Sequence, residues 1–487
     1  MSTTVEAPPD PLATPEQAPK RTSHPRRWLI LAVVLVVEIM DLLDGTIVNV
    51  AAPTIRTDLG ASTTSLQWIV GGYALALAVG LVIGGRLGDL YGRRRLFTIG
   101  IVLFTISSLL SGLAPSTEVL IAFRLLQGLA AALMIPQGFG ILHSAFSTED
   151  LNKAFGIFGP IIGLSAVFGP IVGGALVDAN LFGTGWRLVF LINLPLGILA
   201  LIGSIRILPE SKTTGATRMD WLGAVLVAAA AGLLVYPLMQ GREADWAPWT
   251  FIMMASSFVV LGLFTWQQGR RVKAGRDPLV TMGLFAKRAF SGGMGIIMLF
   301  FGAFGGLMLA LTLFLQLGLG YSASHAGLSL GPVCLGLAIG AGLAGAVLTP
   351  RFGRHVLHAG FALLVAGVLG TYAVLDAQQM AVTALQLAGP LLVAGIGVGF
   401  VAGSLFGFVL AAVADDEVGS ASGILNALQQ LASAIGIAVL GTVFFGALPK
   451  PGYVAGLEHV ALLVSAIAVA GMALVFLLPR TPREEEA

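Results

Sequence analysis

Long apolar runs recur along the chain at the length that crosses a bilayer. A membrane-spanning helix needs about 20 consecutive, mostly apolar residues. Such runs form a group of six, then a pair, then a second group of six. They lie near 28–50, 67–88, 96–114, 118–142, 154–178, 188–208, 220–240, 248–268, 290–318, 324–348, 355–375, 382–413, 420–447 and 457–478. The pattern predicts an all-α polytopic membrane protein with fourteen spans.

The connections between these runs carry charge unequally. Of the 27 Lys and Arg residues, 22 lie in the two tails or in the even-numbered connections, and only four lie in the odd-numbered ones. Basic residues concentrate on the cytoplasmic side of membrane proteins. Both termini are therefore predicted to be cytoplasmic.

The same pattern divides the chain into domains. Two six-helix bundles are expected at 28–208 and 290–478, with two additional transmembrane helices within 209–268. A cytoplasmic linker at 269–289 and cytoplasmic tails at 1–27, expected to be disordered, and 479–487 complete the chain. The segment from Gly85 to Arg94 is echoed by Leu348 to His355, and related halves are common in secondary transporters.

Composition excludes several classes of protein. Hydrophobic residues make up 56% of the chain and charged residues 11%, with a mean hydropathy of +0.91, which is too apolar for a soluble protein. A single cysteine, Cys334, excludes an intrachain disulfide. The histidines form no ligand cluster, and no phosphate-binding Gly-rich stretch or catalytic constellation is found. We expect no enzyme activity, cofactor, metal or nucleic-acid partner, and an ion gradient as the energy source.

Three carboxylates interrupt the first apolar run. Glu38, Asp41 and Asp44 are spaced at i, i+3 and i+6, so a helix places them within a wedge of about 120°. Intramembrane acids are costly and often serve as proton relays. They are candidates for proton coupling or for binding a substrate cation; the alternative is that a helix end merely lies near water.

Arg124 lies inside the fourth run, with Gln127 one turn further on. A guanidinium stays charged, so it needs an acid, a carbonyl or water. At about 1.5 Å per residue, Asp44 lies about 24 Å from the cytoplasmic face and Arg124 about 9 Å from the outer face. In a core of about 30 Å these depths nearly coincide, so Arg124 is predicted to contact Asp44 or Asp41. The alternative is that Arg124 only reaches the outer interface.

Three further groups of residues are candidates for mechanism. A cytoplasmic turn combines an acid with an arginine and two glycines that are expected to allow close packing. It is predicted to act as a latch. The alternative, anchoring at the membrane surface by positive charge, explains only its arginines. The fifth run has a face of small residues along which another helix can move, although small residues are also ordinary membrane packing. Amides in the second bundle are candidates for lining a cavity. These residues are Gly85, Asp89, Gly92 and Arg93; Gly156, Gly169, Pro170, Gly173 and Gly174; and Gln316, Asn426, Gln429 and Gln430.

These motifs resemble those of the major facilitator superfamily. The cytoplasmic turn resembles the family's cytoplasmic loop signature, and Arg124 to Gly128 is similar to its fourth-span signature. The glycines of the fifth run are similar to the motif of the family's antiporters. Asp44 to Pro53 resembles the first-span signature of the fourteen-span drug:proton antiporters. The resemblance implies a monomer in the cell membrane that exchanges protons for lipophilic compounds, cationic or neutral, such as antibiotics. An exporter of one metabolite and a membrane sensor are the alternatives.

Overall fold

The computed structural model describes residues 23–147, 150, 154, 165, 168–210, 219–276, 278–411, 413–414, 417–447 and 452–481. All regular elements in these residues are helical. Twelve helices among them are long and apolar enough to cross a membrane. The outer parts of both predicted tails, residues 211–218 of the region before the helix pair, and Gly156 lie outside the described residues.

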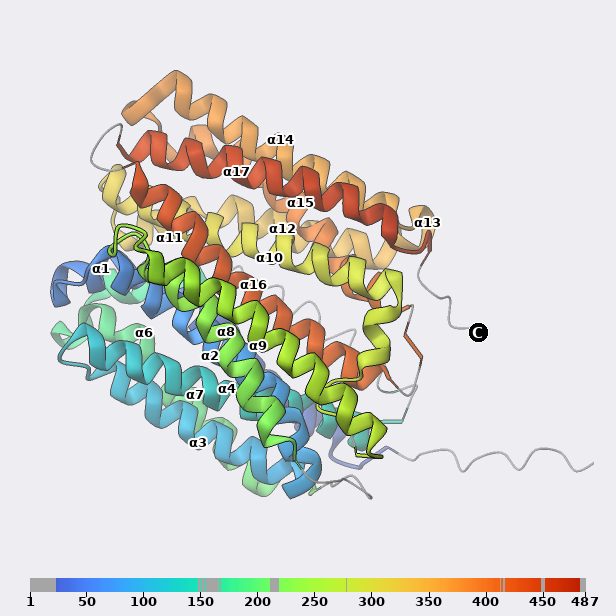
Figure 1. Ribbon diagram of the computed structural model, residues 1–487. Coiled ribbons are helices and arrows are strands. Elements are labelled where there is room, and N and C mark those ends of the chain that lie inside the picture. Colours follow the sequence, from blue (N-terminus) through green and yellow to red (C-terminus); the bar gives the residue numbers. More distant parts are fainter. Residues whose placement is uncertain are drawn as a thin grey trace, which may run out of the picture.

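The first group of helices contains residues up to Arg206. Its members are α1 (Arg27–Leu59), α2 (Thr63–Tyr91), α3 (Arg93–Gly112), α4 (Thr117–Ala145), the helix Phe168–Ala179, η1 (Leu181–Gly183), η2 (Gly185–Arg187), α6 (Leu188–Leu191) and α7 (Asn193–Arg206). α1 is 33 residues long, and the three carboxylates within its apolar run, Glu38, Asp41 and Asp44, set it apart from the twelve apolar helices. The blue and cyan helices of Figure 1 show this group at one side of the molecule.

The second group follows a helical hairpin made of α8 (Trp221–Gln240) and α9 (Pro248–Lys273). Its members are η3 (Met282–Ala286), α10 (Arg288–Leu313), η4 (Phe314–Gly318), α11 (Ala323–Ser329), α12 (Gly331–Leu343), η5 (Ala344–Leu348), α13 (Thr349–Phe352), α14 (His355–Gln378), η6 (Gln379–Ala381), α15 (Ala384–Leu410), α16 (Val418–Gly446), α17 (Tyr453–Leu474) and η7 (Val475–Leu477). In Figure 1 the green hairpin runs beside the junction between the two groups.

The hairpin packs on both groups. Ala74 of α2, Val235 and Met239 of α8, and Ala434 and Ala438 of α16 belong to one buried apolar cluster. α9 faces outward, with large apolar side chains such as those of Phe258 and Trp266 exposed. α8 therefore covers the line where α2 meets α16, and α9 presents its apolar face as a lipid-facing helix does.

α9 extends further than its apolar run predicts. The sequence assigns residues 269–289 to a linker, but the helix continues to Lys273. Arg270, Arg271 and Lys273 occupy its last turn, where positive charge interacts favourably with the helix dipole. Hydropathy alone ends the helix too early because it scores these residues only as polar.

The echo between the two halves corresponds to a shared backbone arrangement. Gly92 and Gly353 both have positive φ, 105° and 54°, and both end a helix. Arg94, two residues after the first glycine, donates to the carbonyl of Ile205 near the end of α7. Arg354 beside the second donates to the carbonyls of Phe476 and Leu478 after α17. In each half, this turn fixes the end of the last helix of its group.

Polar contacts join the two groups. Gln67 of α2 donates to the carbonyls of Ile437 and Ala438 on α16, and Gln316 donates to the carbonyl of Val50 at 2.7 Å. Ser324 N donates to Asp178 Oδ2 at 2.8 Å. These contacts gather toward the end of the molecule where α1 ends and α11 begins.

Candidate functional site

Asp44 lies at the centre of a buried hydrogen-bond network in the first group. Its side chain has no exposed surface, and Arg124, 1% exposed, forms an ion pair with its Oδ2. Gln127 and Asn193 each donate to Asp44 Oδ1 at 2.8 Å. Both carboxylate oxygens are therefore paired, as a charge buried in a protein requires.

Arg124 is satisfied by groups from several helices. Its Nη1 also donates to Gln127 Oε1 at 2.9 Å, and its Nε donates to the carbonyl of Ile69 at 3.1 Å. The guanidinium carbon lies 4.2 Å from the centre of the Tyr73 ring, a cation–π contact. The contact between Arg124 and Asp44 that we predicted from the rise of the helices is present. The alternative that Arg124 only reaches the interface is wrong, because the side chain is buried.

Asp41 and Glu38 have fewer partners than Asp44. Tyr73 donates its hydroxyl to Asp41 Oδ1. Glu38 is 6% exposed, and its Oε1 is buried without a hydrogen-bond partner among the described residues. Gly138 of α4 lies close to this oxygen, since a Cβ added there would lie 3.7 Å from Glu38 Oε1. The three acids thus share one face of α1 but differ in how fully they are hydrogen bonded.

Sequence reasoning assigned no role to Tyr73 or Asn193. Both are polar residues in apolar runs, and both are buried, at 4% and 0% exposed. The polar residue within an apolar run was the signal available in the sequence, and the burial is seen only in the structure. Their target could not be read from the sequence because it depends on how α2 and α7 rotate toward α1.

The turn between α2 and α3, predicted to be cytoplasmic, brings three of its four candidate residues together. Arg93 Nη2 donates to Asp89 Oδ1 at 3.0 Å, and Arg93 Nη1 donates to the carbonyl of Gly140 on α4 at 2.9 Å. Gly92 has the left-handed conformation that favours glycine. An ion pair within the turn and a bond to α4 are consistent with a latch.

Close packing in this region does not involve Gly85. A Cβ there would meet only Pro136, at an ordinary 3.8 Å, whereas a Cβ at Gly84 or Gly88 would overlap Ala132 or Gln137 of α4. The expectation of close packing at Gly85 is therefore wrong. Positions four apart lie on the same face of a helix, and Gly85 is one position beyond the face that touches α4.

The glycines of the fifth run contact both groups. A Cβ at Gly169 would overlap Thr46 of α1, and one at Gly173 would lie 2.5 Å from Ile47 Cγ1. A Cβ at Gly174 would overlap the carbonyl of Ala323 on α11. The segment that contains Pro170 thus packs between α1, two residues after Asp44, and the second group.

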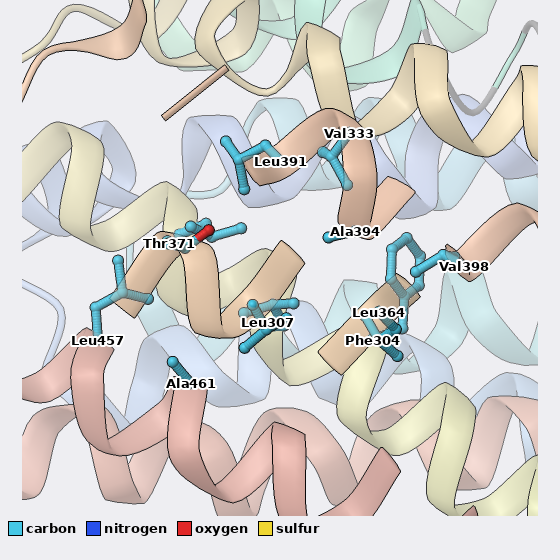
Figure 2. A pocket seen from close by; sticks show the side chains of 12 residues that line it. Phe304, Leu307, Val333, Leu364, Thr371, Leu391, Ala394, Val398, Leu457 and Ala461 are labelled. Carbon is cyan, nitrogen blue, oxygen red and sulfur yellow. The ribbon is translucent and has the colours of Figure 1, made fainter. Parts of the chain in front are cut away.

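One cavity lies wholly within the second group. Figure 2 shows its side chains pointing toward one another from α10, α12, α14, α15 and α17, with a single oxygen, on Thr371. The empty space in and around it, including the part that opens to the outside, is about 360 Å³. Thr371 donates to the carbonyl of Gly367 at 3.0 Å, so its hydroxyl proton is already used. This lining is typical of apolar core packing.

A second cavity lies between the two groups, and the empty space in and around it, including the part that opens to the outside, is about 530 Å³. Neither cavity is lined by the four candidate amides. Gln316 instead joins the groups through Val50, and Asn426 is exposed and donates to Ser422 O. The assignment of these amides to a cavity, with Gln429 and Gln430, stays a prediction.

The described residues contain no group of three or more His, Cys, Asp or Glu side chains placed to hold a metal ion. Glu458 lies near the start of α17 and is partly buried, and its Oε1 is buried without a partner in the described part of the chain. The predicted apolar run 457–478 begins one residue before Glu458, so the sequence alone places this acid at the membrane boundary.

Comparisons with known proteins agree with this architecture. A family model described as Major Facilitator Superfamily matches residues 34–437. The chain is similar in fold to an auto-inhibited peptide transporter of the POT family, with a TM-score of 0.70 at 13% identity over 95% of this chain and 99% of that one. It is also similar to a bacterial homologue of the lysosomal transporter Spinster, with a TM-score of 0.65 at 18% identity over 94% and 97% of the chains.

Relatives of higher identity are named for antibiotics. A probable actinorhodin transporter of Streptomyces coelicolor is 46% identical over 87% of this chain and 74% of its own length. A puromycin resistance protein of Streptomyces alboniger is 35% identical over 90% and 86%, and a tetracenomycin C resistance and export protein of Streptomyces glaucescens is 32% identical over 86% and 76%. The chain is therefore a multi-pass protein of the cell membrane and belongs to the major facilitator superfamily.

Proposed function

We propose that the chain is a proton-coupled antiporter that exports antibiotics or other lipophilic compounds by alternating access. The observation that carries the proposal is the buried ion pair between Asp44 and Arg124. Arginine does not deprotonate in proteins, so the carboxyl of Asp44 is the member of the pair that can exchange a proton. Protonation would leave Arg124 buried without its counter-charge, which couples proton uptake to a rearrangement of α1 against α4.

The other acids extend this site. Asp41 and Glu38 are proposed as further protonation sites or as sites for a substrate cation, with Gln127 and Arg124 orienting Asp44. Asp89 and Arg93 are proposed to act as a latch during the conformational cycle. Replacing Asp89 should slow cycling with less effect on substrate binding, and lost binding with normal cycling would contradict the latch.

The fourteen-span topology with cytoplasmic termini belongs to the same proposal. α1 and the region around the helix Phe168–Ala179 supply two spans beyond the twelve apolar helices. The domains are then those the sequence predicts, with α8 and α9 as the additional pair. In this orientation, the contacts of Gln67, Gln316 and Asp178 lie toward the outer side, where a cavity that faces the cytoplasm needs a closed gate.

An exporter dedicated to one antibiotic is the second candidate. The three relatives described above are each named for a single compound, actinorhodin, puromycin or tetracenomycin C, and they support this narrower function. A substrate panel in a host that lacks its own pumps distinguishes the candidates: a dedicated exporter protects against one chemical family, and a multidrug pump protects against several.

Proton–substrate exchange in inverted vesicles tests the proposal. An imposed pH gradient should drive accumulation of at least one compound of a chemically varied panel, and adding that compound should release protons from energised vesicles. Vesicles with correctly inserted protein that show neither effect with any compound would contradict the proposed function.

A further inference from the structure

The cavity between the two groups has a mostly apolar lining. Eleven residues line it, and seven of them are apolar. The other four are Thr46 and Asn49 of α1, Thr312 of α10 and Cys334 of α12. None of the eleven is Asp, Glu, Lys, Arg or His, so the lining itself offers no counter-charge to an ionic ligand.

None of the three intramembrane acids of α1, Glu38, Asp41 and Asp44, is among the lining residues. At about 100° per residue, Thr46 and Asn49 lie about 140° to 160° around the helix from Asp44. Asp44 turns toward α4 and α7, where Arg124, Gln127 and Asn193 bind it. Asp44 and the cavity therefore occupy different faces of α1, although less than two turns separate Asp44 from Thr46 and Asn49.

The polar groups of the lining mainly accept hydrogen bonds. Thr46 Oγ1 donates to the carbonyl of Leu42 at 2.8 Å, and Thr312 Oγ1 donates to that of Met308 at 2.9 Å. A hydroxyl has one proton, so both oxygens offer only lone pairs to a ligand. Asn49 Nδ2 donates one proton to the carbonyl of Gly45 at 3.3 Å, which leaves one N–H.

Asn49 Oδ1 is buried and has no hydrogen-bond partner among the described residues. Leaving a buried acceptor without a donor destabilises the protein, so a donor supplied by a ligand would be favoured there. The lining thus offers a ligand three oxygen acceptors, but only one free amide N–H and a weakly donating thiol as donors.

Resting on the proposed function, we propose that this cavity binds the exported compound and selects uncharged, lipophilic molecules that carry hydroxyl groups. The ligand hydroxyl donates to Asn49 Oδ1, and Thr46 and Thr312 accept from further hydroxyls. A methyl ether of the same skeleton fills the same volume but cannot donate. A cation finds no carboxylate in the lining, and an anion finds no basic group.

Binding to the full-length protein in lipid nanodiscs, corrected with empty nanodiscs, tests this inference. The probes are naphthol, methoxynaphthalene, naphthylmethylamine and naphthoate, which share one ring system and differ in charge and hydrogen bonding. We expect naphthol to bind about three- to tenfold more tightly than methoxynaphthalene, the contribution of one neutral hydrogen bond. The two charged probes should bind more weakly than naphthol.

Variants locate the effect. Asn49→Leu combined with Thr312→Val should reduce the preference for naphthol over its ether to less than about twofold. Thr371→Val is the matched control, because Thr371 makes the same bond to its own helix but lines the other cavity, and it should keep the preference. Naphthol should also slow modification of Cys334, the only cysteine, by a maleimide in the wild type.

The inference fails if naphthol does not bind above the nanodisc background, if its ether binds equally well, if a charged probe binds best, or if the double variant keeps the preference. Proton–substrate exchange is measured separately. Exchange without a hydroxyl preference would contradict only the ligand class, whereas a hydroxyl preference without exchange would contradict the proposed antiport.

Discussion

At the scale of single residues, the three acids of α1 have unequal surroundings. Asp44 has a charged partner and two amide donors, Asp41 has Tyr73, and Glu38 Oε1 has no partner among the described residues. A charge that is left buried without its partner destabilises the fold more than a pair of uncharged residues at the same two positions does. The ion pair of Asp44 should therefore contribute to stability as well as to coupling.

Replacing Arg124 with Gln should destabilise the protein by about 3–5 kcal/mol, because Asp44 is left buried without its counter-charge. The double variant Arg124→Gln with Asp44→Asn should recover most of this loss. Thermal unfolding of the purified protein in one detergent measures both.

Arg187→Gln is the control for this change. Arg187 pairs with Asp58, and both side chains are substantially exposed, at 31% and 46%. Hydrogen bonds from Trp186 and Arg187 hold the pKa of Asp58 below its usual value, but an exposed pair is worth at most about 1 kcal/mol. Equal losses for the Arg124 and Arg187 variants would contradict the account.

At the scale of helices, a buried carboxylate fixes one end of the hairpin. Asp220, at the start of α8, accepts from Gly223 N and from Gln267 and Gln268 of α9, and pairs with Arg271. Burial acts to raise the pKa of Asp220, but the hydrogen bonds from Gly223, Gln268 and Gln267 and the charge of Arg271 outweigh it and lower the pKa. Asp220 therefore stabilises the hairpin in its ionised form.

The pH dependence follows from the direction of that shift. A carboxyl whose pKa is lowered by folding adds stability at neutral pH and loses it as the pH falls below about 4, through the folded pKa. Asp220→Asn should cost about 1–3 kcal/mol at pH 7 and should flatten this acid limb of a melting curve. The exposed Asp245→Asn should change neither, and an unaltered acid limb in the Asp220 variant would contradict the anchor.

Close packing of the fifth-run helix predicts a selective effect of a single methyl group. Gly169→Ala would overlap Thr46, and such overpacking costs about 1–3 kcal/mol. We expect lower export for the same amount of inserted protein. Gly232→Ala on α8 meets no atom within 4 Å and should be tolerated. Normal export by the Gly169 variant would exclude a role for this contact.

Most helices could be predicted from the sequence because apolar runs of span length have few other structures open to them. The contact between Arg124 and Asp44 was also predictable, since helix rise fixes depth. The rotation of each helix about its own axis could not be predicted. For this reason the sequence assigned no role to Tyr73 or Asn193, and close packing was expected at Gly85. The cavity is lined by residues from both groups of helices, which are far apart in the sequence. Thr46, Asn49 and Thr312 could therefore not be identified from the local sequence pattern.

At the scale of the whole molecule, the proposed topology predicts which loops face the outside. In a Cys334→Ala background, a cysteine replacing Glu243, between α8 and α9, should react with a membrane-impermeant maleimide on intact cells. A cysteine replacing Arg276, after α9, should react only after permeabilisation. Both positions are exposed, so equal reactivity would contradict the predicted orientation.

The central claim, that Asp44 carries the exchanged proton, is tested most directly by pH-driven uptake of a transported compound into inverted vesicles. Asp44→Asn should abolish uptake driven by the pH gradient, while Asp376→Asn, the same change at an exposed position on α14, should leave it intact. Unchanged uptake by correctly inserted Asp44→Asn protein would contradict the account.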